Sequence, residues 1–134
     1  MRSTLSDEQK IAVFREMVSG WQNKQWRKCA DLFTENGKLQ SMMKDEADAT
    51  VGREVFYQRM VGLAQPNKKV ILHVHRVGVI GGAVVSERTD EVIIDGVSRK
   101  VPVVGIMEFE GPLISHWREY YDLAQLRRAQ GKRD

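Results

Sequence analysis

The chain has 134 residues, the length of one domain, and its 42% hydrophobic and 29% charged residues exclude a disordered or collagen-like protein. No stretch approaches the roughly 18 consecutive apolar residues of a membrane span, and no apolar N-terminal region marks a signal peptide, so we expect no membrane association. The formal net charge of +3 resides in the last eight residues (RRAQGKRD), and because residues 1–126 are formally neutral we expect no nucleic-acid partner.

Helical periodicity dominates the first half of the sequence. Ser6 and Gln9 have the spacing of a capping box, and apolar residues recur every three or four positions after them, which predicts an amphipathic helix over residues 7–22. The elements expected next are a shorter helix over residues 26–33, a turn at 36–37, a strand over 38–43, a loop over 44–50 and a helix over 52–64.

Cys29, the single cysteine, lies on the apolar stripe of the second expected helix. It can form no internal disulfide, and no histidine lies beside it in the sequence, so we expect a buried packing residue rather than a catalytic thiol. The lone cysteine and the lack of a signal peptide together favour a cytoplasmic location.

Beyond Pro66 the helical periodicity gives way to runs of β-branched residues separated by tight turns. Asp95–Gly96 is a strong hairpin signal, and Gly81–Gly82 and Glu110–Pro112 mark two further turns. The strands expected between these turns cover residues 70–80, 83–94, 97–109 and 113–122, followed by a short helical end and a basic tail over 127–134. Helices followed by an antiparallel meander indicate a single α+β domain over residues 1–126, with the helices packed on one face of a curved sheet.

One of these strands carries charged residues on a face that has apolar neighbours. Side chains two apart on a strand share a face, so one face of the strand over 83–94 carries Ser86, Arg88, Asp90 and Val92. This alternation sets an arginine beside an aspartate among apolar residues. A structural ion pair on an exposed strand would produce the same pattern.

The last strand offers a second candidate, because Trp117, Glu119 and Tyr121 share one face. Two large aromatic residues indicate that the face is buried, and burying a carboxylate is costly unless it is paired or protonated. Desolvation would raise the pKa of Glu119 and a nearby arginine would lower it, which are the opposing influences that general acid–base sites use. A glutamate at the rim of the fold, paired with a surface cation, is the alternative.

The Arg88-x-Asp90 pair, combined with Trp-Arg-Glu-Tyr-Tyr-Asp-Leu over residues 117–123, resembles limonene-1,2-epoxide hydrolase and, more broadly, the SnoaL-like families of the nuclear transport factor two-like fold. The resemblance implies an α+β cone in which three helices pack on a strongly curved, mixed and mainly antiparallel sheet around a deep hydrophobic pocket. It implies an enzyme that opens an epoxide with water and needs no cofactor and no metal. Glu119 would be the base, Asp90 the acid, and Arg88 the bridge between them.

Two features of this sequence depart from that family. The base position holds Glu119 where the family has aspartate, and the tyrosine and asparagine that hold the water in the family correspond here to Leu39 and Ser41. Two alternatives therefore stay open. One is a SnoaL-like proton-transfer enzyme, such as a cyclase, isomerase or retro-aldol lyase, acting on a hydrophobic or aromatic substrate; the other is a non-catalytic ligand-binding module.

Strand phase and the resemblance together predict the pocket wall and the partners. The residues expected to contact substrate are Leu39, Ser41, Val92, Val101, Val103, Trp117 and Tyr121, with Trp117 placed deeper or at a helix contact. The substrate should be a small, largely apolar molecule with an oxygen function at one end. His73 and His75 have a spacing that a metal could use, but no third ligand is evident, so we expect no metal. The resemblance also implies a homodimer formed through the outer face of the sheet.

Overall fold

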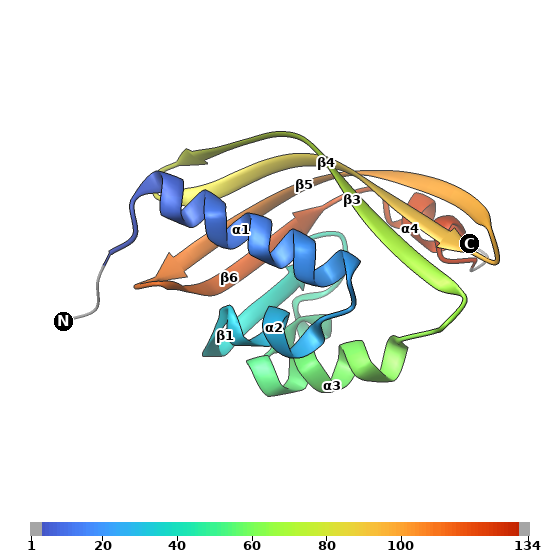
Figure 1. Ribbon diagram of the computed structural model, residues 1–134, viewed down its shortest axis with the longest axis horizontal. Helices are drawn as coiled ribbons and strands as arrows, with labels where there is room; N and C mark the ends of the chain where they lie inside the picture. Colours follow the sequence, from blue (N-terminus) through green and yellow to red (C-terminus); the bar gives the residue numbers. More distant parts are fainter. Residues whose placement is uncertain (1–3, 132–134) are drawn as a thin grey trace.

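The computed structural model describes residues 4–131, and its helices follow the order predicted from the sequence (Figure 1). The first helix, α1 (Asp7–Gln22), has the predicted bounds because the capping box forms: the Ser6 hydroxyl accepts from the Gln9 backbone N–H, and the Gln9 side chain accepts from the Ser6 N–H. The remaining helical segments are α2 (Trp26–Asp31), the short 3-10 turn η1 (Glu46–Asp48), α3 (Arg53–Leu63) and α4 (Leu123–Ala129). In this described part of the chain, no helix is long and apolar enough to cross a membrane.

Within the same residues, six strands form one sheet in the order β2–β1–β6–β5–β4–β3. The last four strands make the predicted antiparallel meander, whereas β1 runs parallel to β6, so the sheet is mixed. The strands are β1 (Phe33–Ser41), β2 (Thr50–Val51), β3 (Lys68–Ile80), β4 (Ala83–Ile94), β5 (Val97–Glu110) and β6 (Leu113–Tyr120).

The largest difference from the sequence-based prediction concerns β1, which begins at Phe33 rather than at residue 38. Phe33 is buried and pairs with Ile114 of β6, so packing against the sheet takes it out of the second helix. Gly37 lies inside the strand, at an irregularity in the pairing, and not at a turn. A Cβ atom at Gly37 would lie 2.8 Å from the Phe33 Cβ and 3.0 Å from the Ile114 carbonyl oxygen, so glycine permits this close approach.

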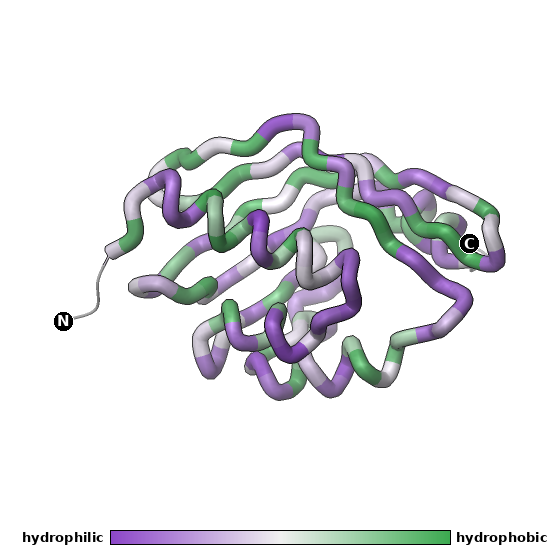
Figure 2. The backbone as a smooth tube through the Cα atoms, viewed as in Figure 1, coloured by the Kyte–Doolittle hydropathy of each residue, from purple (hydrophilic) through white to green (hydrophobic). Residues whose placement is uncertain are grey.

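The three N-terminal helices lie on one side of the sheet, with α1 packed on β3 and β4 and α3 packed beside β1 (Figure 1). Hydrophilic and hydrophobic residues are interspersed along the strands (Figure 2). The hydrophobic side chains of the helices and of one strand face form the core. The buried residues of that core are Phe14, Met17, Cys29, Ala30, Phe33, Phe56, Val84, Met107, Ile114 and Trp117. Burial raises the pKa of the Cys29 thiol to about 12, so this residue stays protonated and serves packing.

The helix α4 includes residues that the sequence analysis assigns to a basic tail. The side chain of Asp122 caps its N-terminus, and Ala129 in its last turn is buried against Val101 of β5. Because apolar packing holds this helix on the sheet, residues 127–129 are part of the domain. Residues 132–134 of the predicted tail lie outside the described residues.

Candidate active site

The pairing of the central strands brings the two predicted charged faces together on the side of the sheet that faces the helices. Glu119 of β6 lies opposite Gly105 of β5, and Arg88 of β4 lies opposite Val103, two residues along β5. Residues two apart on a strand share a face, so Glu119 and Arg88 extend toward each other across β5. On the other side of β6, Ser41 of β1 pairs with Glu119.

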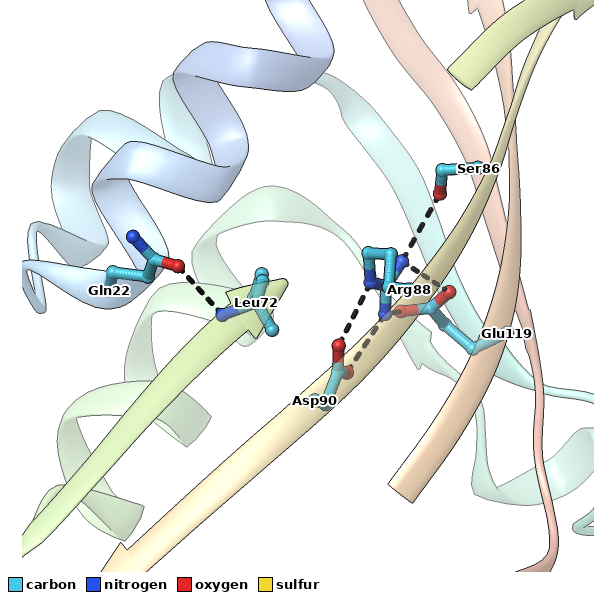
Figure 3. Close-up of polar contacts among 6 residues, drawn as sticks. All are labelled: Gln22, Leu72, Ser86, Arg88, Asp90 and Glu119. Carbon is cyan, nitrogen blue, oxygen red and sulfur yellow. Dashed lines mark hydrogen bonds and ion pairs between the residues drawn. The ribbon is translucent and has the colours of Figure 1, made fainter. Parts of the chain in front are cut away.

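The guanidinium of Arg88 lies at the centre of the site, between Asp90 and Glu119 (Figure 3). Only 1% of the Arg88 side chain is exposed. Its Nε and Nη2 atoms donate to the two carboxylate oxygens of Asp90, both at 3.0 Å. Its Nη1 and Nη2 atoms donate to the two oxygens of Glu119 at 3.2 and 2.7 Å. Nη1 also lies 3.5 Å from the hydroxyl oxygen of Ser86. The three residues singled out in two separate motifs therefore form one bridged cluster.

This cluster has two carboxyl groups and one cation, and burial together with the charges of the neighbours shifts the pKa values of Glu119 and Arg88. Burial raises the pKa of the Glu119 carboxyl; the charge and hydrogen bonds of Arg88 oppose the rise, and the charge of Asp90 adds to it. Burial would lower the pKa of Arg88, but the charges of Glu119 and Asp90 outweigh it and raise that pKa. Arg88 therefore stays protonated, and a single proton on either carboxyl neutralises the cluster. In that state one carboxyl can act as a base and the other as an acid.

A cavity of about 320 Å³ opens over Asp90 and Glu119, both of which line it. Most of the predicted substrate-contacting residues line it too, namely Leu39, Ser41, Val92, Val103 and Tyr121. Met60 of α3, which the sequence marks as a packing or pocket-wall residue, lines it as well. The sequence analysis missed the rest of the apolar wall contributed by helices and flanking segments, namely Trp21, Trp26, Leu63, Val70 and Leu126. Helical periodicity shows which face of a helix is buried, but it does not show whether that face meets the core or a cavity.

Two residues predicted to contact substrate do not line the cavity. Val101 has the expected orientation on β5, but α4 covers it and Ala129 packs against it, so it has no exposed surface. Trp117 is buried in the core, where its ring meets that of Trp21 edge-on with 5.6 Å between centroids. Contact with a helix is one of the two positions expected for Trp117. Val101, in contrast, was expected on the cavity wall and does not line it.

A tyrosine and a serine lie side by side on the cavity wall, and the serine, Ser41, pairs with Glu119 across strands β1 and β6. The Tyr121 hydroxyl donates to Ser41 Oγ at 2.6 Å. Burial raises the pKa of Tyr121, the charge of Glu119 adds to the rise and Ser41 opposes it, so the phenol keeps its proton. The sequence predicts both residues on the wall, but their hydrogen bond depends on the pairing of strands that are far apart in the chain.

Gly105 is a residue of the site that the sequence analysis missed. A Cβ atom at this position would overlap Oε2 of Glu119 and would lie 2.8 Å from Nη1 of Arg88. The carboxylate and the guanidinium thus lie directly over the Gly105 backbone, where glycine alone leaves room for both. The signal in the sequence is a glycine between a valine and an isoleucine inside a predicted strand, a pattern that marks a close approach.

Within residues 4–131, no three histidine, cysteine, aspartate or glutamate side chains come together in a way that could hold a metal ion. His73 and His75, which have a spacing that a metal could use, instead pair with β4. The Nε2 atom of His73 lies 2.8 Å from Glu91, and that of His75 lies 2.7 Å from Thr89. Both contacts are on the sheet face opposite to Asp90.

Comparison with protein families places this site in a known context. Residues 9–132 match the model of the limonene-1,2-epoxide hydrolase (LEH) catalytic domain. The chain belongs to this family. The match covers nearly the whole chain and includes Arg88, Asp90 and Glu119.

Individual relatives agree with membership of the LEH family. Epoxide hydrolase EphG of Mycobacterium tuberculosis is 30% identical over 100 residues, which are 63% of this chain and 66% of that protein. The solved structure of an M. tuberculosis LEH-like epoxide hydrolase superposes with a TM-score of 0.78 at 21% identity, over 93% of this chain and 94% of that chain. An NTF2-like protein of unknown function from Cytophaga hutchinsonii superposes with a TM-score of 0.67 at 16% identity, over 94% and 98% of the two chains. The fold is therefore the α+β, nuclear transport factor two-like fold that the resemblance implies.

Proposed function

We propose that this member of the LEH family is a cofactor-independent hydrolase that opens the epoxide ring of a small, largely apolar substrate with water. The observation that carries the proposal is the pair of carboxyl groups, Asp90 and Glu119, which share the buried Arg88 guanidinium and line one cavity. Family membership supports the reaction, and the apolar wall of the cavity supports the substrate class. In this proposal the cavity is the deep hydrophobic pocket that the cone-shaped fold of the family implies.

The proposed reaction needs one base and one acid. The ionised Glu119 removes a proton from water as the water oxygen attacks an epoxide carbon and the carbon–oxygen bond breaks. The protonated Asp90 gives its proton to the departing epoxide oxygen, and the product is a diol. The raised pKa of Glu119 makes its carboxylate a stronger base. To complete the cycle, the proton that Glu119 took from water passes to Asp90 within the cluster that Arg88 bridges.

The attacking water would be held by Glu119 together with Ser41 and Tyr121, since Leu39 offers no hydrogen-bonding group. Tyr121 donates to Ser41, which leaves the Ser41 hydroxyl hydrogen free to point toward a water bound by Glu119. In this proposal the Ser41–Tyr121 pair takes the place of the tyrosine and asparagine that the family uses.

Tyr121→Phe is expected to lower kcat about 10-fold and to change KM less than about twofold. The substitution removes the hydrogen bond that orients Ser41 and leaves the shape of the cavity unchanged, and one such bond contributes about 1 kcal/mol. Tyr57→Phe is the matched control, because Tyr57 of α3 does not line the cavity and its ring stacks on Arg27. Steady-state kinetics on both variants make the test, and equal kcat values would remove Tyr121 from the proposed water site.

Gly105→Ala is expected to lower kcat about 100-fold, because the added methyl group displaces Glu119 and Arg88 from their present positions. Gly78→Ala is the matched control: Gly78 lies in β3, and a Cβ atom there would have no neighbour within 4 Å. Rates are measured for both variants, and circular dichroism shows whether both fold. If Gly105→Ala turns over substrate as fast as Gly78→Ala, the close approach has no role in positioning.

Incubation with a panel of cyclic and linear epoxides in ¹⁸O-labelled water tests the proposed function. The expected product is a diol with one labelled oxygen, and Asp90→Asn should form it at least about 100-fold more slowly. No labelled diol from any member of the panel would overturn the proposal. In a parallel incubation in D₂O, a proton-transfer enzyme would exchange a substrate C–H for deuterium without forming a diol, and a binding module would retain its ligand unchanged.

We also propose that the protein is a homodimer formed through the outer face of the sheet, as the resemblance implies. On that face Val104 of β5 pairs with Tyr120 of β6, and each is 38% exposed. Sedimentation equilibrium should give twice the chain mass of 15.3 kDa. A mass of one chain at every concentration would contradict the dimer.

A further inference from the structure

The two ends of the cavity differ in their chemistry. At the inner end lie Asp90 and Glu119, whose side chains are 18% and 14% exposed. At the opening, the lining residues with a positive charge are Lys24, Lys44, Arg59 and the half-buried Lys68. Among the exposed lining residues, one carries a negative charge, namely Asp48. The opening is therefore strongly cationic, although residues 1–126 as a whole are neutral.

Separate elements bring these cations to the opening, and neutral groups hold two of them there. Arg59 of α3 donates from Nη1 to the hydroxyl oxygen of Thr50 at 2.7 Å, and Thr50 is itself buried. Lys24, in the turn after α1, donates from Nζ to the backbone carbonyl oxygen of Gln65 at 3.2 Å. A neutral acceptor fixes the position of a cation without cancelling its charge.

Other surface cations of the protein are arranged differently. Arg27 lies 2.6 Å from a carboxylate oxygen of Glu54, and Lys28 lies 2.9 Å from one of Glu16. These pairs neutralise their own charges. The contrast indicates that the positive charges of Lys24 and Arg59 are available to a bound molecule.

A polar depression continues from the cavity opening along the protein surface. It shares Lys44, Asp48 and Arg59 with the cavity, and it adds the cation of Arg127 and the carboxylate of Asp45. Three cations and two carboxylates therefore line the depression, and a group bound there would be in contact with solvent.

We propose that the substrate is an amphipathic epoxide whose apolar body fills the cavity and whose anionic head group, a carboxylate or a phosphate, binds Lys44 and Arg59 at the opening. This inference rests on the proposed epoxide hydrolysis and extends it to a substrate class. A cavity of about 150 Å³ holds one benzene molecule, so about 320 Å³ holds an apolar body of roughly twice that size. The head group then fixes which atoms of that body reach Asp90 and Glu119.

Binding of unreactive ligands tests the head group without requiring catalysis. The probes are a saturated ten-carbon carboxylic acid, its methyl ester and the phosphate monoester of the matching alcohol, measured by calorimetry. The acid is expected to bind about 10-fold more tightly than the ester, and raising the salt concentration should reduce the difference. Tighter binding of the phosphate than of the carboxylate would support the anionic site and would assign phosphate as its head group. Equal binding of all three probes would overturn the inference.

Variants at the opening locate the binding site. Arg59→Gln and Lys44→Gln should each reduce the preference for acid over ester several-fold. Arg76→Gln is the matched control, because Arg76 pairs with Glu87 on the far face of the sheet. A preference that survives both variants would place the head group elsewhere and overturn the inference.

Turnover of the corresponding epoxides separates this inference from the proposed function. Hydrolysis of acid and ester with equal kcat/KM would retain the hydrolase and overturn the anionic substrate class. A preference for the acid in binding, with no diol from any epoxide, would retain the anionic site and overturn the hydrolase. Diol formation with at least a 10-fold higher kcat/KM for the acid supports both.

Discussion

Glu119→Gln is expected to lower kcat about 1,000-fold while the chain still folds. The amide has the shape of the carboxyl group and can accept a hydrogen bond from Arg88, but it cannot take a proton from water. General bases typically contribute factors of about 10² to 10⁴ in rate. Steady-state kinetics with an epoxide that the wild-type protein hydrolyses give the rate, and thermal unfolding shows that the variant is folded.

The pH dependence of kcat/KM in the wild-type protein is a second test of Glu119 as the base. Protonation of Glu119 removes the base, so kcat/KM should fall about tenfold per pH unit below the pKa of Glu119. Burial raises this pKa, so the fall begins above the ordinary range of a glutamate. The control Glu87→Gln changes an exposed glutamate on the opposite face of β4 and should keep the wild-type profile. If Glu119→Gln retains a tenth of the wild-type kcat, another residue is the base.

Arg88→Met is expected to reduce the free energy of unfolding by about 4 kcal/mol at pH 8, since removing one partner of a buried ion pair costs about 3–5 kcal/mol. Methionine fills much of the space, but Asp90 and Glu119 lose the cation that pairs with both. Urea unfolding measures the change. Arg27→Met, which removes a cation from an exposed ion pair with Glu54, is the control and should change the stability far less.

The loss of stability in Arg88→Met should be smaller at pH 5 than at pH 8. Without Arg88, the charge and the hydrogen bonds that chiefly oppose the effect of burial are lost, so the pKa of Glu119 in the folded state rises further. A carboxyl whose pKa is higher in the folded than in the unfolded state favours folding at low pH and loses that contribution as pH rises. Adding Glu119→Gln to Arg88→Met should therefore restore part of the stability at pH 8. The same loss at both pH values would show that lost packing, not uncompensated charge, explains the effect.

Alternation along single strands was sufficient to predict which charged side chains share a face of the sheet. The face of β4 that carries Arg88 and Asp90 and the face of β6 that carries Glu119 follow from a period of two residues. The distance between these faces does not follow from that period, because it depends on the register of both strands with β5. Gly105 illustrates the difference: its place in a strand is evident from the sequence, but the groups that lie over it are not.

Tertiary packing explains where the sequence analysis differs from the structure. Phe33 has helical spacing with Cys29, yet its pairing with Ile114 places it in β1. Val101 has the correct strand phase for a cavity wall, yet Ala129 covers it. In both cases a contact between distant parts of the chain outweighs the local pattern.

The helix α4 forms a part of the cavity wall that lies outside the sheet. It consists of seven residues near the C-terminus, it packs on the sheet through Ala129, and its Leu126 lines the cavity. Within the described residues no strand follows α4. The apolar side chains of α4 can therefore change without altering the strand register that brings Arg88 and Glu119 together. A change of Leu126 would therefore reshape the cavity wall while Arg88, Asp90 and Glu119 keep their places on the sheet.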